Sequence, residues 1–389
     1  MNAMDASTVI LIGHQRRLLL PALQAARAGG IRRRIVVGDR ATRRLRWSTS
    51  CSRHVLVDLQ DQRAVTDRLL ELACEFPQAV LVPCDCQATS LLHRVRSRVP
   101  LPTIPHADPE LIELLDDKSR FQRFCEEQDL AVPEALAFAG KEQLVFDALA
   151  DALGVPFVVK PVRGSGSLGV VVVRHAEELQ RGVLDDGGYP AGAVVVQRYV
   201  PGCDVDVDLF AVDGRLRAAT VHRVRGHQMQ FGRHAALEAL AGRLCAATHY
   251  SGPMNIDARI EQGTGRIFLI ESNPRYWASL LAPAACGLNF LREGLEAARP
   301  GPPAPTRFLG TGSTSTRHPL LRPAEWRALL ADRGERGRLL RSSVLDPYAL
   351  VLFGATLPAL ARRVLRRLAA PLRRSAGRVG SEQAREAIS

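Results

Sequence analysis

The sequence predicts an α/β and α+β protein, in which a parallel unit is followed by a mixed unit and then by a basic helical extension. Three observations predict this class. Short apolar runs alternate with helical patterns over residues 1–105, whereas apolar runs separated by Gly or Asp turns dominate residues 106–298. Residues 299–389 begin with a Pro- and Gly-rich stretch and then become rich in arginine. A chain of 389 residues with 46% hydrophobic side chains is long enough for two or three packed units.

The first 105 residues are predicted to form a parallel, Rossmann-like unit. The predicted strands are residues 8–12, 35–37, 55–57 and 79–82, and the predicted helices are residues 18–28 and 63–75. Strands that alternate with helices are typical of parallel sheets. Gly13 ends the first strand without the other glycines of a Gly-x-Gly-x-x-Gly fingerprint, so we do not expect conventional dinucleotide binding.

The second unit is predicted to be mixed α/β with antiparallel hairpins. Prolines between residues 100 and 109 mark a connector, which places a domain boundary near residue 105. Predicted strands flank a glycine loop between residues 155 and 173 and recur at 193–200, 205–212 and 267–270. Residues 299–316 are interpreted as a linker or a loose loop, and the pattern after them is helical and rich in arginine.

Composition excludes some partners and favours one compartment. The net charge of +12 could indicate nucleic acid, but aromatic residues make up 5% and no nucleic-acid-binding signature occurs, so no such partner is expected. Eight scattered cysteines and no recognisable secretory leader favour reduced thiols in a cytoplasmic protein. Cys84 and Cys86 lack a second Cys or His cluster, so we interpret them as packed thiols at a strand end rather than as zinc ligands.

An apolar stretch begins at Tyr348 and is followed by arginines. Its apolar length is about thirteen residues, below the ~20 that a membrane-spanning helix needs. One interpretation is a peripheral membrane contact through residues 348–378. The alternative is a helix packed on the body of the protein, followed by a solvated basic tail.

Lysine is rare, and its positions indicate where anions bind. The chain has three lysines against 49 arginines, and Lys118 and Lys160 open its most polar segments. A compact ammonium suits phosphate oxygens where a planar guanidinium does not. Lys160 precedes a glycine loop that resembles a phosphate-covering hairpin, with candidate contacts at Gly164, Ser165, Gly166, Ser167 and Gly169. The loop is not a Walker A motif, because no Gly-Lys-Ser/Thr follows.

Carboxylates and amides about a hundred residues later indicate a metal site. The segments are Asn255-Ile256-Asp257 and Glu271-Ser272-Asn273-Pro274-Arg275. If a turn lies at residues 262–265, Asp257 and Glu271 lie on neighbouring hairpin strands and point at one place. Such oxygen ligands suit Mg²⁺ shared with phosphate oxygens, although an ordinary polar hairpin end is the alternative.

In this order and spacing, the motifs resemble those of the ATP-grasp superfamily. The resemblance covers roughly residues 105–295 and is nearest to the carbamoyl-phosphate-synthase-like branch of carboxylate-amine ligases. It implies a two-lobed ATP-grasp fold, with lobes at residues 106–192 and 193–298. The N-terminal unit, including residues 82–85, looks like the pre-ATP-grasp domain that precedes this fold.

The resemblance also implies roles for individual residues. Lys118, Lys160 and the loop from Gly164 to Gly169 would contact the phosphates of ATP. The segment Gln197, Arg198, Tyr199 and Val200 would hold adenine, and Asp204 would take the ribose. The family usually has an acidic residue where Gln197 stands and Glu at the ribose position, so this chain departs from the pattern twice. Asp257, Glu271 and Asn273 would bind Mg²⁺, with Mn²⁺ as an alternative, and Arg275 would steady the transferred phosphoryl group.

The implied activity is ATP-dependent amide or peptide bond formation through an acyl phosphate, between a small-molecule carboxylate and an amine. Carboxylation, carbamate phosphorylation and a non-catalytic nucleotide-binding protein recruited to membranes are the alternatives. A homodimer is compatible with this interpretation. A strand is predicted at residues 215–221, and Arg223 follows it between His222 and Arg225. Arg223 is the candidate substrate ligand together with Arg275, because carboxylates favour bidentate arginine. Tyr276, Trp277 and Ser279 follow Arg275 and are candidates for the same pocket, and the alternative is that the aromatic pair after the strand belongs to the core.

Overall fold

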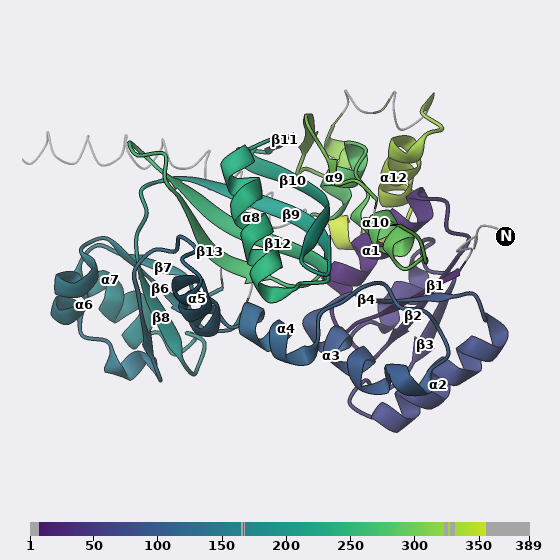
Figure 1. Cartoon of the computed structure of the whole chain (residues 1–389), viewed down its shortest axis with the longest axis horizontal. Coiled ribbons are helices and arrows are strands. Elements are labelled where there is room, and N and C mark those ends of the chain that lie inside the picture. The colour runs from purple at the N-terminus through teal and green to yellow at the C-terminus, as the bar shows by residue number, and fades with distance from the viewer. Residues whose placement is uncertain are drawn as a thin grey trace, which may run out of the picture.

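The computed structural model describes residues 8–164, 166, 168–302, 304–322, 326 and 331–354. Three sheets organise the described chain. Figure 1 shows the small four-stranded sheet of the central region at one end, the largest sheet in the middle and the N-terminal parallel sheet at the other end.

The N-terminal unit is a parallel sheet covered by helices on both faces. Its strands have the order β3-β2-β1-β4, and all neighbours run parallel. They are β1 (Thr8–Ile12), β2 (Arg33–Gly38), β3 (Arg53–Leu56) and β4 (Val80–Pro83), joined by α1 (Arg16–Ala28), η1 (Arg43–Trp47), α2 (Gln62–Glu75), α3 (Cys86–Val95) and η2 (Arg96–Arg98). Every residue of β1 is buried, as expected for a strand covered on both faces. The predicted Rossmann-like unit is therefore confirmed.

A small antiparallel sheet forms the first lobe of the central region. Its strand order is β5-β8-β6-β7. The elements are α4 (Pro109–Asp116), α5 (Lys118–Glu127), β5 (Ala135–Phe138), η3 (Lys141–Gln143), α6 (Phe146–Leu153), β6 (Phe157–Pro161), β7 (Val171–Val173), α7 (Ala176–Leu179), η4 (Gln180–Leu184) and β8 (Val194–Arg198). Leu149 and Leu153 of α6 pack on Phe157 and Val159 of β6, so one face of the sheet is core. The glycine loop connects β6 to β7.

The largest sheet forms the second lobe. Its order is β13-β12-β9-β10-β11-β15, with β14 beside β10. Its elements are β9 (Gly202–Val212), β10 (Arg215–Arg225), β11 (Gln228–Gly232), α8 (Ala235–Thr248), β12 (Gly252–Glu261), β13 (Ile267–Asn273), α9 (Leu281–Ala285), α10 (Phe290–Ala297), β14 (Arg307–Phe308) and β15 (Gly312–Ser315). Leu237 and Ala241 of α8 pack on Ala219 and Val221 of β10, so α8 covers one face. On the other face, Phe290 of α10 shares a core with α1 of the N-terminal unit.

The interpretation of residues 299–316 as a linker or loose loop is wrong. Within this stretch β14 pairs in parallel with β10, and β15 pairs in antiparallel with β11. The Thr and Ser residues of β15 form an edge strand, in which small and β-branched residues are tolerated.

The described part of the C-terminal extension packs on the body of the protein. It contains η5 (Pro319–Leu321) and α12 (Glu335–Val344), and α12 lies against α1 and α9. Tyr348 is buried, and its hydroxyl accepts a hydrogen bond from Arg16 Nη1 at 3.2 Å. This supports the packed alternative as far as residue 354, whereas the basic residues beyond it lie outside the described chain. No helix within the described ranges has the length and apolarity that crossing a membrane requires.

Candidate active site

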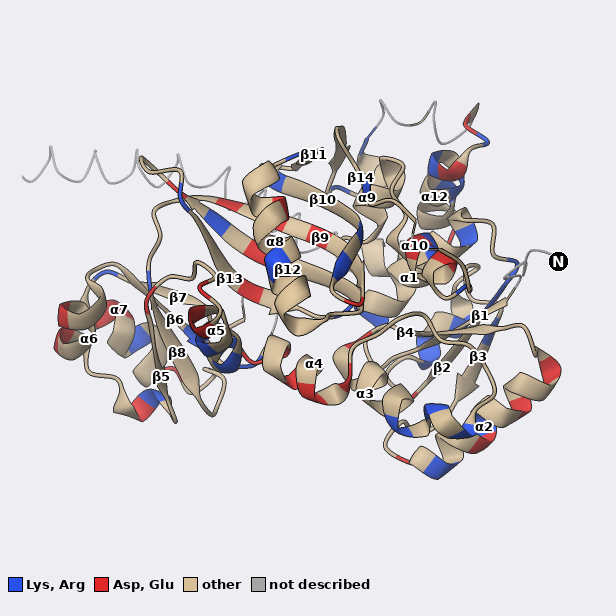
Figure 2. Cartoon of the chain, in the orientation of Figure 1, with Lys and Arg blue, Asp and Glu red and all other residues tan. Residues whose placement is uncertain are grey.

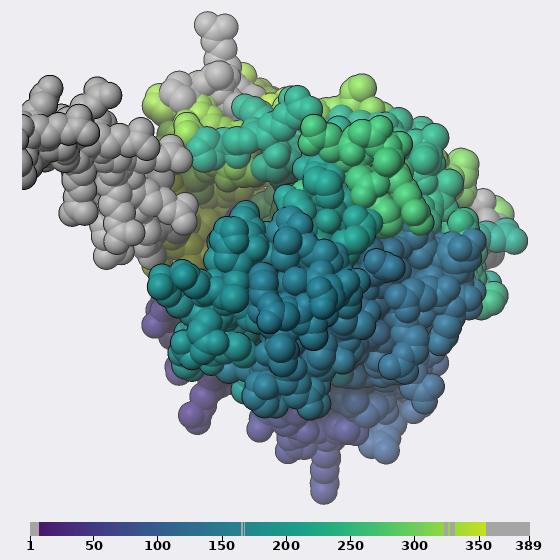
Figure 3. Space-filling view, turned by 90° about the vertical axis from the view of Figure 1, so that its left-hand side faces the viewer, coloured from purple at the N-terminus to yellow at the C-terminus, as the bar shows by residue number. Residues whose placement is uncertain are grey.

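A cavity of about 340 Å³ lies where the small lobe meets the large sheet. In the space-filling view of Figure 3, residues of the small lobe (blue to teal) lie in front, with residues of the second lobe (green) above them. Among the lining residues are these predicted site residues: Lys118, Lys160, Gly164, Gln197, Arg198, Tyr199, Val200, Asp204, Asp257 and Glu271. Residues that are up to 153 positions apart therefore meet in one place.

Lys118 reaches the cavity from the first position of α5. Asp117 caps this helix, since its Oδ1 accepts hydrogen bonds from the backbone N–H groups of Ser119 and Arg120, both at 3.0 Å. The ammonium of Lys118 lies 3.2 Å from Glu271 Oε2 and donates to the carbonyl of Gly164 at 3.0 Å. Lys118 thus connects the glycine loop to the carboxylates of the large sheet.

Lys160 lies on β6 and is almost fully buried. Its Nζ donates to Gln197 Oε1 at 2.9 Å and to the carbonyl of Ile270 at 3.2 Å. Burial lowers the pKa of Lys160 to about 8, although the negative charge of Glu271 opposes this shift. The neutral Gln197 hydrogen-bonds Lys160 but supplies no counter-charge, so an anion in the cavity would stabilise the ammonium.

The face of the large sheet toward the cavity carries two polar rows. Backbone register places His222, Asp206, Asp257 and Glu271 in one row. The next row consists of Thr220, Asp208, Asn255 and Asn273. Residues two apart on a strand share a face, so both rows point the same way. Figure 2 shows acidic residues (red) on β9 and on strands beside it. The predicted pairing of Asp257 with Glu271 across a hairpin is confirmed by this register.

The carboxylates of Asp257 and Glu271 fit a shared divalent cation. Burial, followed by the nearby charges of Asp206 and Glu271, raises the pKa of Asp257 well above its usual range, and Asp257 also hydrogen-bonds Glu271. Two carboxylates this close repel each other unless a proton or a cation lies between them. Magnesium is commonly held by one or two carboxylates plus phosphate oxygens, which matches this pair. In the part of the chain that is described, no three His, Cys, Asp or Glu side chains form a metal cluster by themselves.

Asn273 and Arg275 lie beside the carboxylate row but do not line the cavity. Arg275 Nη2 donates to Asn273 Oδ1 at 2.7 Å, and Asn273 Nδ2 donates to Asn255 Oδ1 at 3.1 Å. Both side chains are buried. The oxygen predicted as a metal ligand is therefore hydrogen-bonded to the arginine predicted to contact the phosphoryl group.

His222 and two aspartates form a buried charged cluster that sequence reasoning missed. His222 Nε2 lies 2.9 Å from Asp206 Oδ2, and His222 Nδ1 lies 3.3 Å from Asp208 Oδ2. Burial opposes the charge of His222, but Asp208 and Asp206 outweigh it and raise its pKa to about 10. Asp206 also lines the cavity. The alternation Asp204-Val205-Asp206-Val207-Asp208 was the signal, because it places three carboxylates on one face of a strand.

Arg259 supports the segment predicted to hold adenine and ribose. Its guanidinium donates to Asp204 Oδ1 at 2.6 Å, to the carbonyl of Val200 at 2.8 Å and to the carbonyl of Gly202 at 3.1 Å. It also lies over the ring of Tyr199, 5.2 Å from its centroid. Arg259 was not among the predicted site residues. It fixes the backbone at Val200 and Gly202 and the exposed carboxylate of Asp204.

The glycine loop reaches toward the N-terminal unit. Gly164, Gly166 and Gly169 all have positive φ, and a Cβ at Gly169 would lie 2.8 Å from Pro161 Cγ, so this position requires glycine. A Cβ at Gly166 would lie 3.7 Å from Arg17 Nη1 of α1. Ser165 and Ser167, predicted as phosphate contacts, lie outside the described residues.

The structure does not bring Arg223 to the cavity. The prediction assumed that a strand ended at residue 221, but β10 continues to Arg225. Alternation therefore places Arg223 and Arg225 on the face opposite His222. Tyr276 and Trp277 lie in the hydrophobic core, which is the alternative to a place in the substrate pocket.

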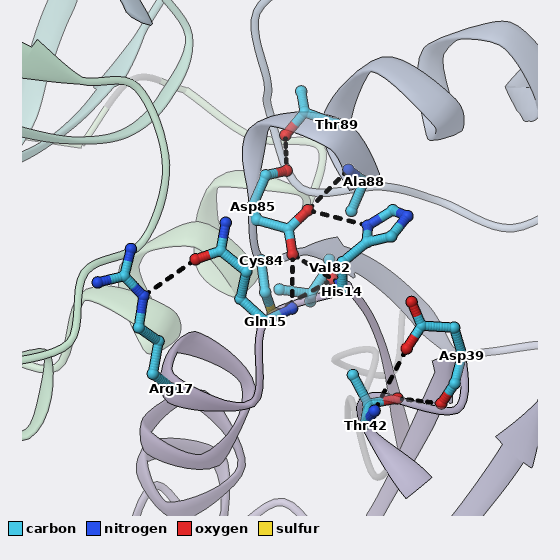
Figure 4. Close-up of polar contacts among 10 residues, drawn as sticks. All are labelled: His14, Gln15, Arg17, Asp39, Thr42, Val82, Cys84, Asp85, Ala88 and Thr89. Carbon is cyan, nitrogen blue, oxygen red and sulfur yellow. Dashed lines mark hydrogen bonds and ion pairs between the residues drawn. The ribbon is translucent and has the colours of Figure 1, made fainter. Parts of the chain in front are cut away.

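A further polar cluster lies at the carboxyl ends of β1 and β4 (Figure 4). Asp85 accepts hydrogen bonds from the backbone N–H groups of His14, Gln15 and Ala88 at 2.7, 3.2 and 2.9 Å. It thereby caps the start of α3 and fixes the residues that lead into α1. Arg17 Nε donates to Gln15 Oε1 at 3.0 Å, which directs this arginine toward the glycine loop.

Comparison with known proteins gives consistent matches. A family model described as "ATP-grasp in the biosynthetic pathway with Ter operon" matches residues 191–308, and one described as "D-ala D-ala ligase C-terminus" matches residues 126–236. The carbamoyl phosphate synthase large chain of Pseudomonas aeruginosa is 25% identical over 223 residues, which cover 52% of this chain and 20% of that one. The match thus spans about a fifth of that relative's length.

Solved structures share the fold. The L-amino acid ligase from Bacillus licheniformis superposes with a TM-score of 0.55 at 18% identity, covering 76% of this chain and 74% of that one. N5-carboxyaminoimidazole synthetase from Staphylococcus aureus, complexed with ADP, superposes with a TM-score of 0.55 at 14% identity and 80% coverage of both. The resemblance to the ATP-grasp superfamily that the motifs predicted is thus supported by family models over residues 126–308, by carbamoyl phosphate synthase relatives and by solved structures that share the fold.

Proposed function

We propose that this protein is an ATP-dependent carboxylate-amine ligase, which forms an amide or peptide bond through an acyl phosphate and releases ADP and phosphate. One observation carries the proposal: Lys118 and Lys160 converge with Asp257 and Glu271 on a single cavity between two lobes. A binding module would need the lysines but not the carboxylate pair. Proteins that share the fold include an L-amino acid ligase and an N5-carboxyaminoimidazole synthetase, which supports this class.

The chain's own residues would act by position and charge. The γ-phosphoryl group would lie between Lys118 and the carboxylate row, where a substrate carboxylate attacks phosphorus in line. Lys160 gains full charge when a phosphate replaces part of its lost hydration. Arg275, held by Asn273, lies just behind this place and is our candidate for the group that neutralises the transferred phosphoryl.

Asp257 and Glu271 would hold the magnesium ion, and Asn273, whose amide oxygen accepts a hydrogen bond from Arg275, would orient that arginine. Held there, the ion would supply positive charge that offsets the negative charge of the phosphates during transfer. The His222 cluster would keep Asp206 in place next to Asp257, because both nitrogens of this imidazole face carboxylates.

The test is a screen for ADP and phosphate release across amino acids, dipeptides and hydroxy acids, with mass spectrometry of the products. We expect ADP to form only when Mg²⁺, a carboxylate and an amine are all present, and the product to be an amide. Glu271→Gln should lower turnover about 100-fold or more, whereas Glu75→Gln, an exposed change in the N-terminal unit, should leave it unchanged. Absence of ADP from every combination would contradict the proposal, and ADP formed with bicarbonate alone would favour carboxylation or carbamate phosphorylation instead.

A further inference from the structure

A second and larger cavity lies next to the candidate active site. Its volume is about 620 Å³, and it is lined by residues of α1, β11, α9, β15 and the described part of the C-terminal extension. Small-molecule sites commonly measure about 300–1,000 Å³. Of the predicted substrate-pocket residues, Ser279 lines this second cavity rather than the first one.

The two cavities lie over the same face of the large sheet. Register pairs Val224 of β10 with Met229 of β11, and Met229 with Thr314 of β15, so these side chains share the face of His222. Asp206 on β9 lines the first cavity, and Met229 on β11 lines the second. Strands β9 and β11 are separated only by β10, so the two linings are about 10 Å apart across the sheet.

One segment of the chain contributes lining residues to both cavities. Glu271 lines the first cavity, and Ala278 and Ser279, a few residues further on, line the second. The buried Arg275 lies between them in sequence, hydrogen-bonded to Asn273 and to the carbonyl of Tyr276. The segment that carries Glu271 at the first cavity therefore also forms part of the wall of the second cavity.

The lining combines an apolar wall with positive charge. Leu20, Leu281 and Leu340 come from three different helices and form part of the apolar wall. The charged residues among the described lining are arginines, and no Asp or Glu is among them. Arg322 is oriented by Thr314, because its Nη1 donates to Thr314 Oγ1 at 3.5 Å. Such a wall favours a ligand with an apolar body and a negative group.

We propose that the second cavity binds one substrate of the ligase, an organic anion with a bulky apolar body whose anionic group contacts Arg322. The claim that the ligand is a substrate rests on the proposed function. The claim that the cavity binds such an anion does not depend on it. The lack of acidic residues in the described lining disfavours a cationic ligand, and the volume exceeds what the smallest amino acids would fill.

The test is calorimetry on the full chain without nucleotide, with three probes of one shape: 4-phenylbutyrate, 4-phenylbutanol and 4-phenylbutylamine. We expect the anion to bind at least tenfold more tightly than the alcohol, and the amine not to bind. Arg322→Gln should weaken binding of the anion at least tenfold, and Ala282→Phe, which fills the cavity from α9, should abolish it. Arg215→Gln, an exposed change at the start of β10, is the matched control and should have no effect.

Each result decides one of the two proposals. If wild type binds none of the probes, the inference is overturned. It is also overturned if Arg322→Gln binds the anion as tightly as wild type does. If Ala282→Phe does not fold, Arg322→Gln still provides the decision. ADP, titrated separately, should bind wild type and both variants with equal affinity. If wild type binds the anion but not ADP, the proposed ligase function is contradicted, whereas the proposed anion site in the second cavity is not.

Discussion

Replacing Lys160 by methionine removes the ammonium proposed to contact phosphate while keeping most of the side-chain volume. A charge-assisted hydrogen bond to an anion contributes about 1.5–3 kcal/mol, and each 1.4 kcal/mol is a factor of ten in affinity. The dissociation constant for ADP should therefore rise by about tenfold to 150-fold. Calorimetric titration of ADP into wild type and variant measures this change.

The same substitution should leave the fold nearly as stable. With its pKa lowered to about 8, the buried Lys160 carries a charging penalty of about 3 kcal/mol, which methionine removes. Against this, Gln197 Oε1 and the carbonyl of Ile270 lose their donor, at a cost of about 1–3 kcal/mol each. These effects oppose each other, so the change in the free energy of unfolding, measured in urea, should lie between a gain of about 1 kcal/mol and a loss of about 3 kcal/mol.

Lys141 provides the matched control, because it lies outside the cavity and donates to the carbonyls of Val183 and Asp186 at 2.7 and 2.8 Å. Lys141→Met should bind ADP as wild type does. If Lys160→Met binds ADP with unchanged affinity while remaining folded, or if Lys141→Met loses as much affinity, the assignment of the phosphate site is refuted.

Three further predictions follow from the charges around the cavity. Affinity for ADP should fall by up to about tenfold per pH unit above pH 8, because the neutral Lys160 must then take up a proton on binding. Calorimetry in buffers of different ionisation enthalpy should detect that proton, and a constant affinity up to about pH 9.5 would contradict this prediction. His222 has a pKa raised to about 10 from 6.5, so its stabilising contribution is complete below pH 6.5 and is lost as pH rises through 10. The stability difference between wild type and His222→Gln in urea should shrink over that range, and parallel curves would argue against a charged imidazole. Asp204→Ala should raise the dissociation constant for ADP about 5- to 30-fold through lost ribose hydrogen bonds, with stability changed by less than about 1 kcal/mol because the carboxylate is exposed, and unchanged affinity would remove Asp204 from the site.

Local patterns were sufficient to predict the parts of the fold that depend on neighbouring residues. The apolar runs of the N-terminal unit appear as β1 to β4, since strands buried on both faces have a continuous apolar sequence. The Asp257–Glu271 hairpin was also predictable, because a short turn fixes the register of the strands it joins.

Features that depend on distant pairing were not predicted. His222 meets Asp206 only through the register of β9 and β10, and Arg223 faces away because β10 runs four residues further than expected. Residues 312–315 have the composition of a loop, and they become a strand because β11, about 80 residues earlier in the chain, offers an open edge. Arg259 carried no sequence signal, since its role depends on the path of residues 200–204 beside it.

The measurement that tests the chemistry most directly is the transfer of oxygen from the substrate carboxylate to phosphate. The wild-type chain, supplied with ATP, Mg²⁺, an amine and a carboxylate labelled with ¹⁸O, should release inorganic phosphate that carries one labelled oxygen for each amide formed, because the acyl phosphate bridges through that oxygen. Unlabelled phosphate, or release of AMP in place of ADP, would contradict the proposed route.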